Sequence, residues 1–212
     1  MPVRVGGLVS ENQGTIDYCR YTGTIHASAG NGQVCVGGIT YINDNSATIS
    51  HCENVGIILA ESGNSTEVKD TISSLVNESS IHLGGIAGKT DWHSTIDQCR
   101  ATCTIRITGE SHYEYWYIGG IVGSGFVATF SNCCFNGTLS INVDIKDVAS
   151  GIYKVGGLAG DGGYESKYEN CYVSGVITDS SPSLGGVPAW LASDAPGCEF
   201  TACYYPAGTL DP

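Results

Sequence analysis

Residues 5–19 read Val-Gly-Gly-Leu-Val-Ser-Glu-Asn-Gln-Gly-Thr-Ile-Asp-Tyr-Cys, and this stretch returns in diverged form along the whole chain. Its first block is a Gly-Gly pair between aliphatic residues, and six such pairs occur at intervals of 29 to 47 residues. The first glycines of the six pairs are Gly6, Gly37, Gly84, Gly119, Gly156 and Gly185. Internal repetition of this kind is typical of solenoids, in which each copy forms one structural unit.

A second block follows each pair and consists of a large apolar residue, two further residues and a cysteine. The first glycine precedes its cysteine by 13 to 18 residues, so the two blocks keep the same order in every copy. The six cysteines are Cys19, Cys52, Cys99, Cys133, Cys171 and Cys203. Because they recur at one repeat position, we expect free thiols stacked as an inward ladder of small apolar groups. A disulfide that involves one of the other four cysteines remains an alternative: Cys35, Cys103, Cys134 and Cys198.

Alternation around the Gly-Gly pairs indicates β-strands. One column of residues lies two positions before the aliphatic residue that leads each pair. It is mostly apolar, and we expect it to face inward: Val3, Val34, Ile81, Trp116, Tyr153 and Pro182. The residues between form a mostly polar column, which we expect to face solvent: Arg4, Cys35, His82, Tyr117, Lys154 and Ser183. This period of two is the pattern of a strand. The odd spacing from the second block's apolar residue to its cysteine predicts a bend between them, because both cannot face inward along one regular strand.

The predicted fold is therefore all-β: a parallel β-solenoid, similar to a right-handed β-helix, of six diverged repeats in a single domain over residues 1–212. The longest interval holds an insertion at residues 61–80 between repeats 2 and 3, whose apolar spacing is compatible with a short lateral helix. Solenoid ends normally carry caps, and here the repeat begins at once. We therefore expect a fragment of a longer protein.

The composition excludes several classes of function. The chain has 9 basic and 21 acidic residues, for a net charge of -12, and no cluster of lysine or arginine. Such a surface repels nucleic acid. Hydrophobic residues make up 42% of the chain, yet no apolar run approaches the roughly 20 residues that span a membrane. We therefore expect no nucleic-acid partner and no membrane insertion by this chain.

The repeat resembles the GLUG repeat: Gly-Gly-aliphatic, a polar turn, Thr-Ile-x-x-Cys and then Gly-x-Ile. Residues 5–19 and 155–175 match best, and the likeness covers nearly the whole chain outside the insertions. Copies 1 and 2 depart from the pattern with Ser10 and Tyr41, where other copies have glycine. The family belongs to secreted or surface-anchored bacterial proteins, including adhesin-like proteins and IgA-directed metallopeptidases, where the repeat is an accessory region. The resemblance thus implies a fold and an extracellular location, and no catalytic residue.

The sequence gives little support for an enzyme. It has no His-Glu-x-x-His, no Gly-x-Ser-x-Gly and no phosphate-binding loop, and it indicates neither a metal nor a cofactor. Some β-solenoids cleave polysaccharides with paired carboxylates, so that remains an alternative. The pairs nearest in sequence or repeat position are Asp17 with Asp97, Asp144 with Asp147, and Glu165 with Glu169. Their simpler interpretation is solvated loop charge.

An aromatic row is the candidate ligand site. It contains Tyr113, Tyr115, Trp116 and Tyr117, and exposed aromatic rows stack on sugar rings or anchor protein interfaces. The alternative is that the row packs under the preceding insertion, and Trp92 and Trp190 are likewise interpreted as loop anchors. The predicted function is that of an adhesin-like surface region that binds a host glycan or protein. A ligand-free structural stalk is the main alternative.

Overall fold

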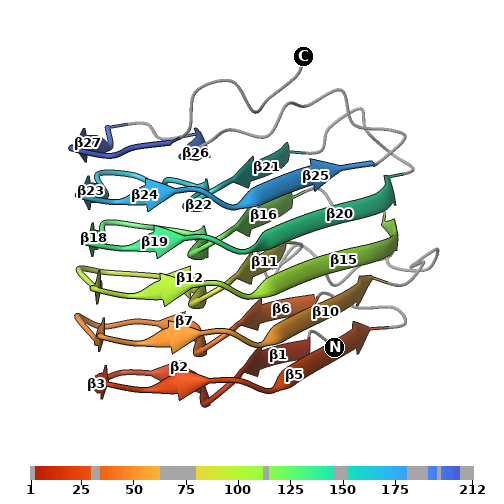
Figure 1. Ribbon diagram of the computed structural model, residues 1–212, viewed down its shortest axis with the longest axis horizontal. Helices are drawn as coiled ribbons and strands as arrows, with labels where there is room; N and C mark the ends of the chain where they lie inside the picture. The colour runs from red at the N-terminus through yellow and green to blue at the C-terminus, as the bar shows by residue number, and fades with distance from the viewer. Residues whose placement is uncertain are drawn as a thin grey trace, which may run out of the picture.

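The computed structural model describes residues 3–29, 34–62, 80–111, 115–145, 152–180, 191–194 and 197–205. They form a stack of parallel coils, and each complete coil contributes one strand to each of five sheets (Figure 1). We name the sheets A to E in the order in which the chain visits them. Every strand pair in these sheets is parallel, so the predicted parallel β-solenoid is confirmed.

The strands of the first two sheets flank the Gly-Gly pairs. Sheet A contains β1 (Val3–Gly6), β6 (Val34–Gly37), β11 (Ser80–Gly84), β16 (Tyr115–Gly119) and β21 (Ile152–Gly156). Sheet B contains β2 (Val9–Asn12), β7 (Thr40–Asn43), β12 (Ala87–Thr90), β17 (Val122–Ser124), β22 (Ala159–Asp161) and β26 (Ala192–Asp194).

The strands of the other three sheets follow the polar turn. Sheet C contains β3 (Thr15–Asp17), β8 (Thr48–Ser50), β13 (Thr95–Asp97), β18 (Thr129–Ser131), β23 (Lys167–Glu169) and β27 (Glu199–Thr201). Sheet D contains β4 (Arg20–Tyr21), β9 (Glu53–Asn54), β14 (Arg100–Ala101), β19 (Cys134–Phe135) and β24 (Tyr172–Val173). Sheet E contains β5 (Thr24–Ala29), β10 (Ile57–Ser62), β15 (Thr104–Ser111), β20 (Thr138–Ile145) and β25 (Val176–Asp179).

The repeat count differs slightly from the prediction. Within the described residues there are five complete coils, and the sixth copy contributes β26, β27 and an isolated bridge from Tyr204 to Tyr172. The insertion at 61–80 begins at the end of β10 and ends at the start of β11. Residues 63–79, and with them the predicted lateral helix, lie outside the described residues. No helix occurs in the part of the chain that the structure describes, so none there is long and apolar enough to cross a membrane.

Like residues stack in register through the core. Ile49, Ile96, Phe130 and Tyr168 form one column of sheet C, and each is at most 1% exposed. Stacking of this kind lets each coil bury the apolar face that it cannot cover alone. The aromatic part of the column continues upward, because Phe130 stacks on Tyr168 at 4.6 Å and Tyr168 on Phe200 at 4.8 Å between ring centroids.

The predicted bend before each cysteine is present in all six copies. The residue directly before the cysteine has a left-handed backbone, with φ between 50° and 54°, in Tyr18, His51, Gln98, Asn132, Asn170 and Ala202. This single residue turns the chain from sheet C into sheet D. The cysteine can therefore point inward three residues after an inward apolar residue.

Candidate functional site

A groove of about 570 Å³ lies on the outside of the solenoid, where the outer faces of sheets A and B meet. It crosses coils 3, 4 and 5. Its lining residues are His82, Lys89, Asp91, Trp92, Tyr117, Ser124, Gly125, Phe126, Lys154, Asp161, Gly163 and Tyr164. The two sheets contact each other across this corner, since Lys154 Nζ on β21 lies 3.1 Å from Asp161 Oδ2 on β22. Each of these three coils has this concave corner in its cross-section, and the stacked corners form a groove that runs along the solenoid.

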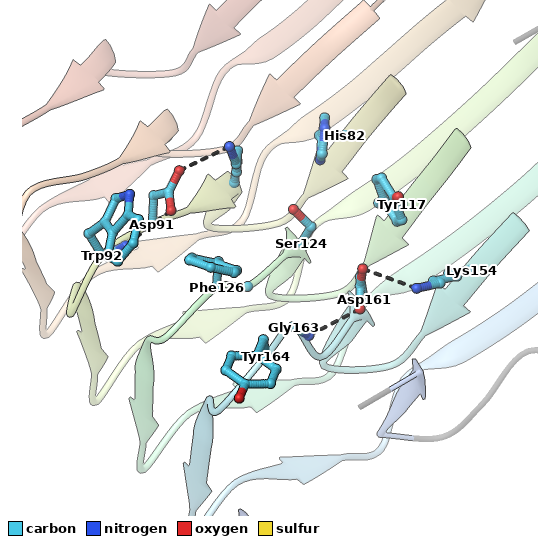
Figure 2. A pocket seen from close by; sticks show the side chains of 12 residues that line it. His82, Asp91, Trp92, Tyr117, Ser124, Phe126, Lys154, Asp161, Gly163 and Tyr164 are labelled. Atoms are coloured by element: carbon cyan, nitrogen blue, oxygen red, sulfur yellow. Dashed lines mark hydrogen bonds and ion pairs between the residues drawn. The ribbon is translucent and has the colours of Figure 1, made fainter. Parts of the chain in front are cut away.

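The groove is built from three columns, each with one residue per coil (Figure 2). Sheet A contributes His82, Tyr117 and Lys154, which lie in register on β11, β16 and β21. Sheet B contributes Lys89, Ser124 and Asp161, in register on β12, β17 and β22. The turn that follows sheet B contributes Trp92, Phe126 and Tyr164. The repeat itself therefore assembles the site from residues more than 70 positions apart.

The turn column is aromatic and open to solvent. Trp92 is 56% exposed and Tyr164 is 53% exposed, and Phe126 between them is half-buried. Trp92 meets the edge of Phe126 at 5.3 Å between ring centroids. The turns that carry these rings contain left-handed residues, among them Trp92 itself at φ 36°, and adjacent turns are joined by backbone hydrogen bonds such as Val127 N to Tyr164 O at 2.9 Å. The scaffold thus holds a row of rings that are themselves free to contact a ligand.

The charged groups of the groove are paired within it. Lys89 lies 3.0 Å from Asp91, and Lys154 lies 3.1 Å from Asp161. The second carboxylate oxygen of Asp161 also accepts a hydrogen bond from Gly163 N at 3.1 Å, which closes the turn. Lys154 Nζ lies 5.5 Å from the centre of the Tyr117 ring, within cation–π range. Two cations therefore face two anions, and the lining carries no net charge while His82 is neutral.

His82 forms the deep end of the sheet A column. Its side chain is 7% exposed and its ring lies 5.0 Å from that of Tyr117. Burial is the main cause that lowers the pKa of His82, to about 3, and the positive charges of Lys89 and Arg4 lower it further. The imidazole is therefore neutral at all ordinary pH values.

The low pKa of His82 predicts that the folded state loses stability as the pH falls. Between pH 6.5 and 3 an unfolded histidine binds a proton and native His82 does not, so the free energy of unfolding falls as the pH falls. From pH 7 to pH 4.5 the loss due to this group is about 2–3 kcal/mol. Urea unfolding at both pH values should show a smaller loss for His82→Gln than for the wild type. His26→Gln, at a histidine whose side chain is 57% exposed, is the control and should leave the loss unchanged. Equal losses in wild type and His82→Gln would contradict the assignment.

The structure divides the predicted aromatic row. Tyr117 lines the groove. Tyr115 is half-buried on the same outer face, with its ring stacked 6.3 Å from that of Tyr117, but it is not part of the groove lining. Trp116 is 1% exposed in the core, so its inclusion as a ligand contact was wrong, because alternation turns it inward between the two tyrosines. Tyr113 lies outside the described residues.

Two further expectations need correction. Alternation predicts that Cys35 and His82 face solvent, but they are 3% and 7% exposed because the outer faces of sheets A and B cover each other at the corner. The sequence favours a loop anchor at Trp92, yet more than half of this side chain is exposed. Trp190 lies outside the described residues. The signal that could have identified the turn column is an aromatic residue seven or eight positions after the first glycine of a pair, as in Trp92, Phe126 and Tyr164.

The six repeat cysteines form one inward column, and its four middle members belong to the hydrophobic core. Cys52, Cys99, Cys133 and Cys171 are buried, and Cys19 and Cys203 at the two ends are half-buried. Each thiol from the second coil onward contacts two carbonyl oxygens. Cys133 Sγ, for example, lies 3.2 Å from Ser131 O in its own coil and 3.4 Å from Ile96 O in the preceding coil. Burial raises the pKa of Cys133 well above its usual value, so this thiol stays protonated and acts as a small core residue.

The carboxylates singled out in the sequence lie elsewhere. Asp17 and Asp97 are in register on the outer face of sheet C, separated by Ser50 in the intervening coil. A hydrogen bond with His51 at 2.9 Å is the main cause that holds the pKa of Asp17 below its usual value. Glu165 and Glu169 belong to the turn and strand of coil 5, and Asp147 lies outside the described residues, so the structure gives no geometry for its pair with Asp144.

Within the described ranges, no three His, Cys, Asp or Glu side chains are placed to hold a metal ion. The residues that line the groove offer aromatic faces, paired charges and hydroxyl groups to a ligand. In comparisons with known proteins, no family model, no curated protein and no solved structure matches the chain.

Proposed function

We propose that this chain is a carbohydrate-binding β-solenoid of a secreted or surface-displayed, adhesin-like protein, and that the groove is its binding site. One observation carries the proposal: three successive coils place an aromatic ring at the same turn position, beside paired charges, in an open groove.

This combination suits the chemistry of a sugar. A pyranose ring has apolar faces of C–H groups and a rim of hydroxyl groups. Aromatic rings such as Trp92 and Tyr164 offer apolar surface to the faces. Carboxylates and ammonium groups already paired with each other, such as Asp161 and Lys154, offer fixed acceptors and donors to the hydroxyls.

Other classes of ligand fit the groove less well. The chain's net charge of -12 disfavours nucleic acid. An extended peptide usually binds by adding a strand to a free sheet edge. Among the described residues, the strands that carry the sheet B column offer no such edge, because β12 pairs with β7 and β17, and β22 pairs with β17 and β26. Among the described residues that line the groove, both lysines already have a carboxylate partner, which disfavours a phosphate or a carboxylate as ligand.

The resemblance to the GLUG repeat supports the proposed setting, since that family occurs in secreted and surface-anchored bacterial proteins. The main alternative is a ligand-free stalk, or an accessory region of a larger secreted peptidase. The two functions differ in one respect. A ligand-free stalk does not require half-exposed aromatic rings to gather in one groove, and a binding site does.

Loss of the exposed rings tests the proposal. Wild type and a Trp92→Ala/Tyr164→Ala double variant are compared on a glycan array and then by calorimetry with the best ligand. We expect the double variant to bind at least about 10-fold more weakly, since two stacking contacts are lost. Both side chains are more than half exposed, so the variant should keep the wild-type circular dichroism spectrum.

The matched control is Tyr18→Ala, which removes a 76% exposed aromatic ring at the bend between sheets C and D, outside the groove. Tyr18→Ala should bind like the wild type. Equal binding by the double variant and the wild type would show that the binding site lies outside the groove. A wild type that binds no glycan would favour the stalk.

A further inference from the structure

We infer that the ligand of the groove is a linear, uncharged oligosaccharide that lies along the axis of the stack and occupies three sugar positions, one per coil. This rests on the proposed function and adds to it the orientation, the length and the charge of the ligand.

The orientation follows from how the contacts repeat. The aromatic column, the sheet B column and the sheet A column all run from coil 3 to coil 5, in register and roughly 4.8 Å apart per step (Figure 2). A ligand along the axis meets an aromatic ring and a polar partner in each coil. A ligand across the coils would meet only one ring of the turn column. Only the axial orientation uses Trp92, Phe126 and Tyr164 together.

The length follows from where the column stops. In coil 2 the corresponding turn position is Asn45 and the sheet B position is Ile42, so neither the ring nor the polar partner is present. Neither residue lines the groove. The rings lie seven residues before the repeat cysteine, and in the sixth copy the same count gives Pro196. Coils 3, 4 and 5 therefore supply three aromatic positions, and a sugar unit beyond either end of the column would find no equivalent ring.

The ion pairs of the groove indicate that the ligand is uncharged. Lys89 is within 3.0 Å of Asp91, and Lys154 is within 3.1 Å of Asp161. An acidic sugar would approach each carboxylate as closely as each ammonium group, and the chain's net charge of -12 would repel it. Uncharged hydroxyl groups can donate to the aspartates and accept from the lysines at the same time. The ion pairs then remain intact when the ligand binds.

Calorimetry with ligands of increasing length tests the inference. The probes are the cello-, malto-, xylo- and manno-oligosaccharides of one to six units, together with oligogalacturonides of the same lengths as the acidic counterpart. For the neutral series that binds, we expect affinity to rise about 10-fold per unit up to three units and less than about threefold beyond. The acidic series should bind more weakly at every length.

Shortening the aromatic column gives a sharper test. Tyr164→Ala removes the ring of coil 5 and should move the plateau from three sugar units to two. A plateau that stays at three units would overturn the assignment of one unit per coil. Affinity that does not depend on length, or tighter binding of oligogalacturonides, would overturn the inference and leave carbohydrate binding standing. Absence of binding in every series and on the glycan array would overturn the proposed function as well.

Discussion

Replacing Gly120 with alanine is expected to destabilise the folded state severely. A Cβ atom on Gly120 would lie 2.2 Å from the carbonyl oxygen of Gly157 and 2.2 Å from Cγ of Phe135. The oxygen belongs to the next coil, which is fixed to this one by the hydrogen bond from Gly120 N to Gly156 O. The coils would have to separate at the Gly-Gly corner, at a cost of at least about 4 kcal/mol. That is a large part of the stability of an ordinary domain.

The measurement is circular dichroism with urea unfolding, and the control is Gly14→Ala. No heavy atom beyond the neighbouring residues lies within 4 Å of a Cβ atom on Gly14, so this variant should unfold at nearly the wild-type urea concentration. The two variants make the same chemical change in the same repeat motif. A folded Gly120→Ala protein with wild-type stability would show that the coils do not approach as closely as described.

Replacing Phe130 with alanine is expected to lower the free energy of unfolding by about 3–5 kcal/mol. Phe130 is 1% exposed and lies in the middle of the sheet C column, stacked 4.6 Å from the Tyr168 ring. Its removal leaves a cavity between Ile96 below and Tyr168 above. The cavity cannot close, because the backbone hydrogen bonds keep the coils at a regular spacing.

Phe200→Ala is the matched control, because Phe200 belongs to the same column one coil beyond Tyr168 and is 38% exposed. Its loss should be about 1 kcal/mol, since much of the ring already contacts solvent. Urea unfolding of both variants measures the difference. Equal losses at the two positions would contradict the account of a core that is continuous through the coils and ends at the last one.

The repeated motifs were sufficient to predict the fold from the sequence. The Gly-Gly pairs and the cysteine blocks predicted the parallel coils, and the odd spacing before each cysteine predicted the bend that left-handed residues such as His51 provide. These features repeat six times, so each copy supports the interpretation of the others. The fold is predictable because stacking requires the same residue type at the same position in every coil.

The groove was less predictable, for a physical reason. Alternation along a strand tells which side of its own sheet a residue faces. It does not tell whether another sheet covers that side, and this is why His82 is buried on the outer face of sheet A. The aromatic residues of the turn column lie in turns of three different copies, where the sequence shows no alternation. Only the register of the coils brings Trp92 and Tyr164 into one groove.

Binding in the groove can be observed directly by a ¹H–¹⁵N NMR titration with the tightest-binding neutral oligosaccharide. The indole N–H signals of Trp92 and Trp116 act as two reporters in one chain, since Trp92 is 56% exposed in the groove and Trp116 is 1% exposed in the core. We expect the Trp92 indole signal to shift progressively to saturation, with much smaller shifts for Trp116. A bound ligand that leaves the Trp92 signal unchanged would contradict the claim that the groove is the binding site.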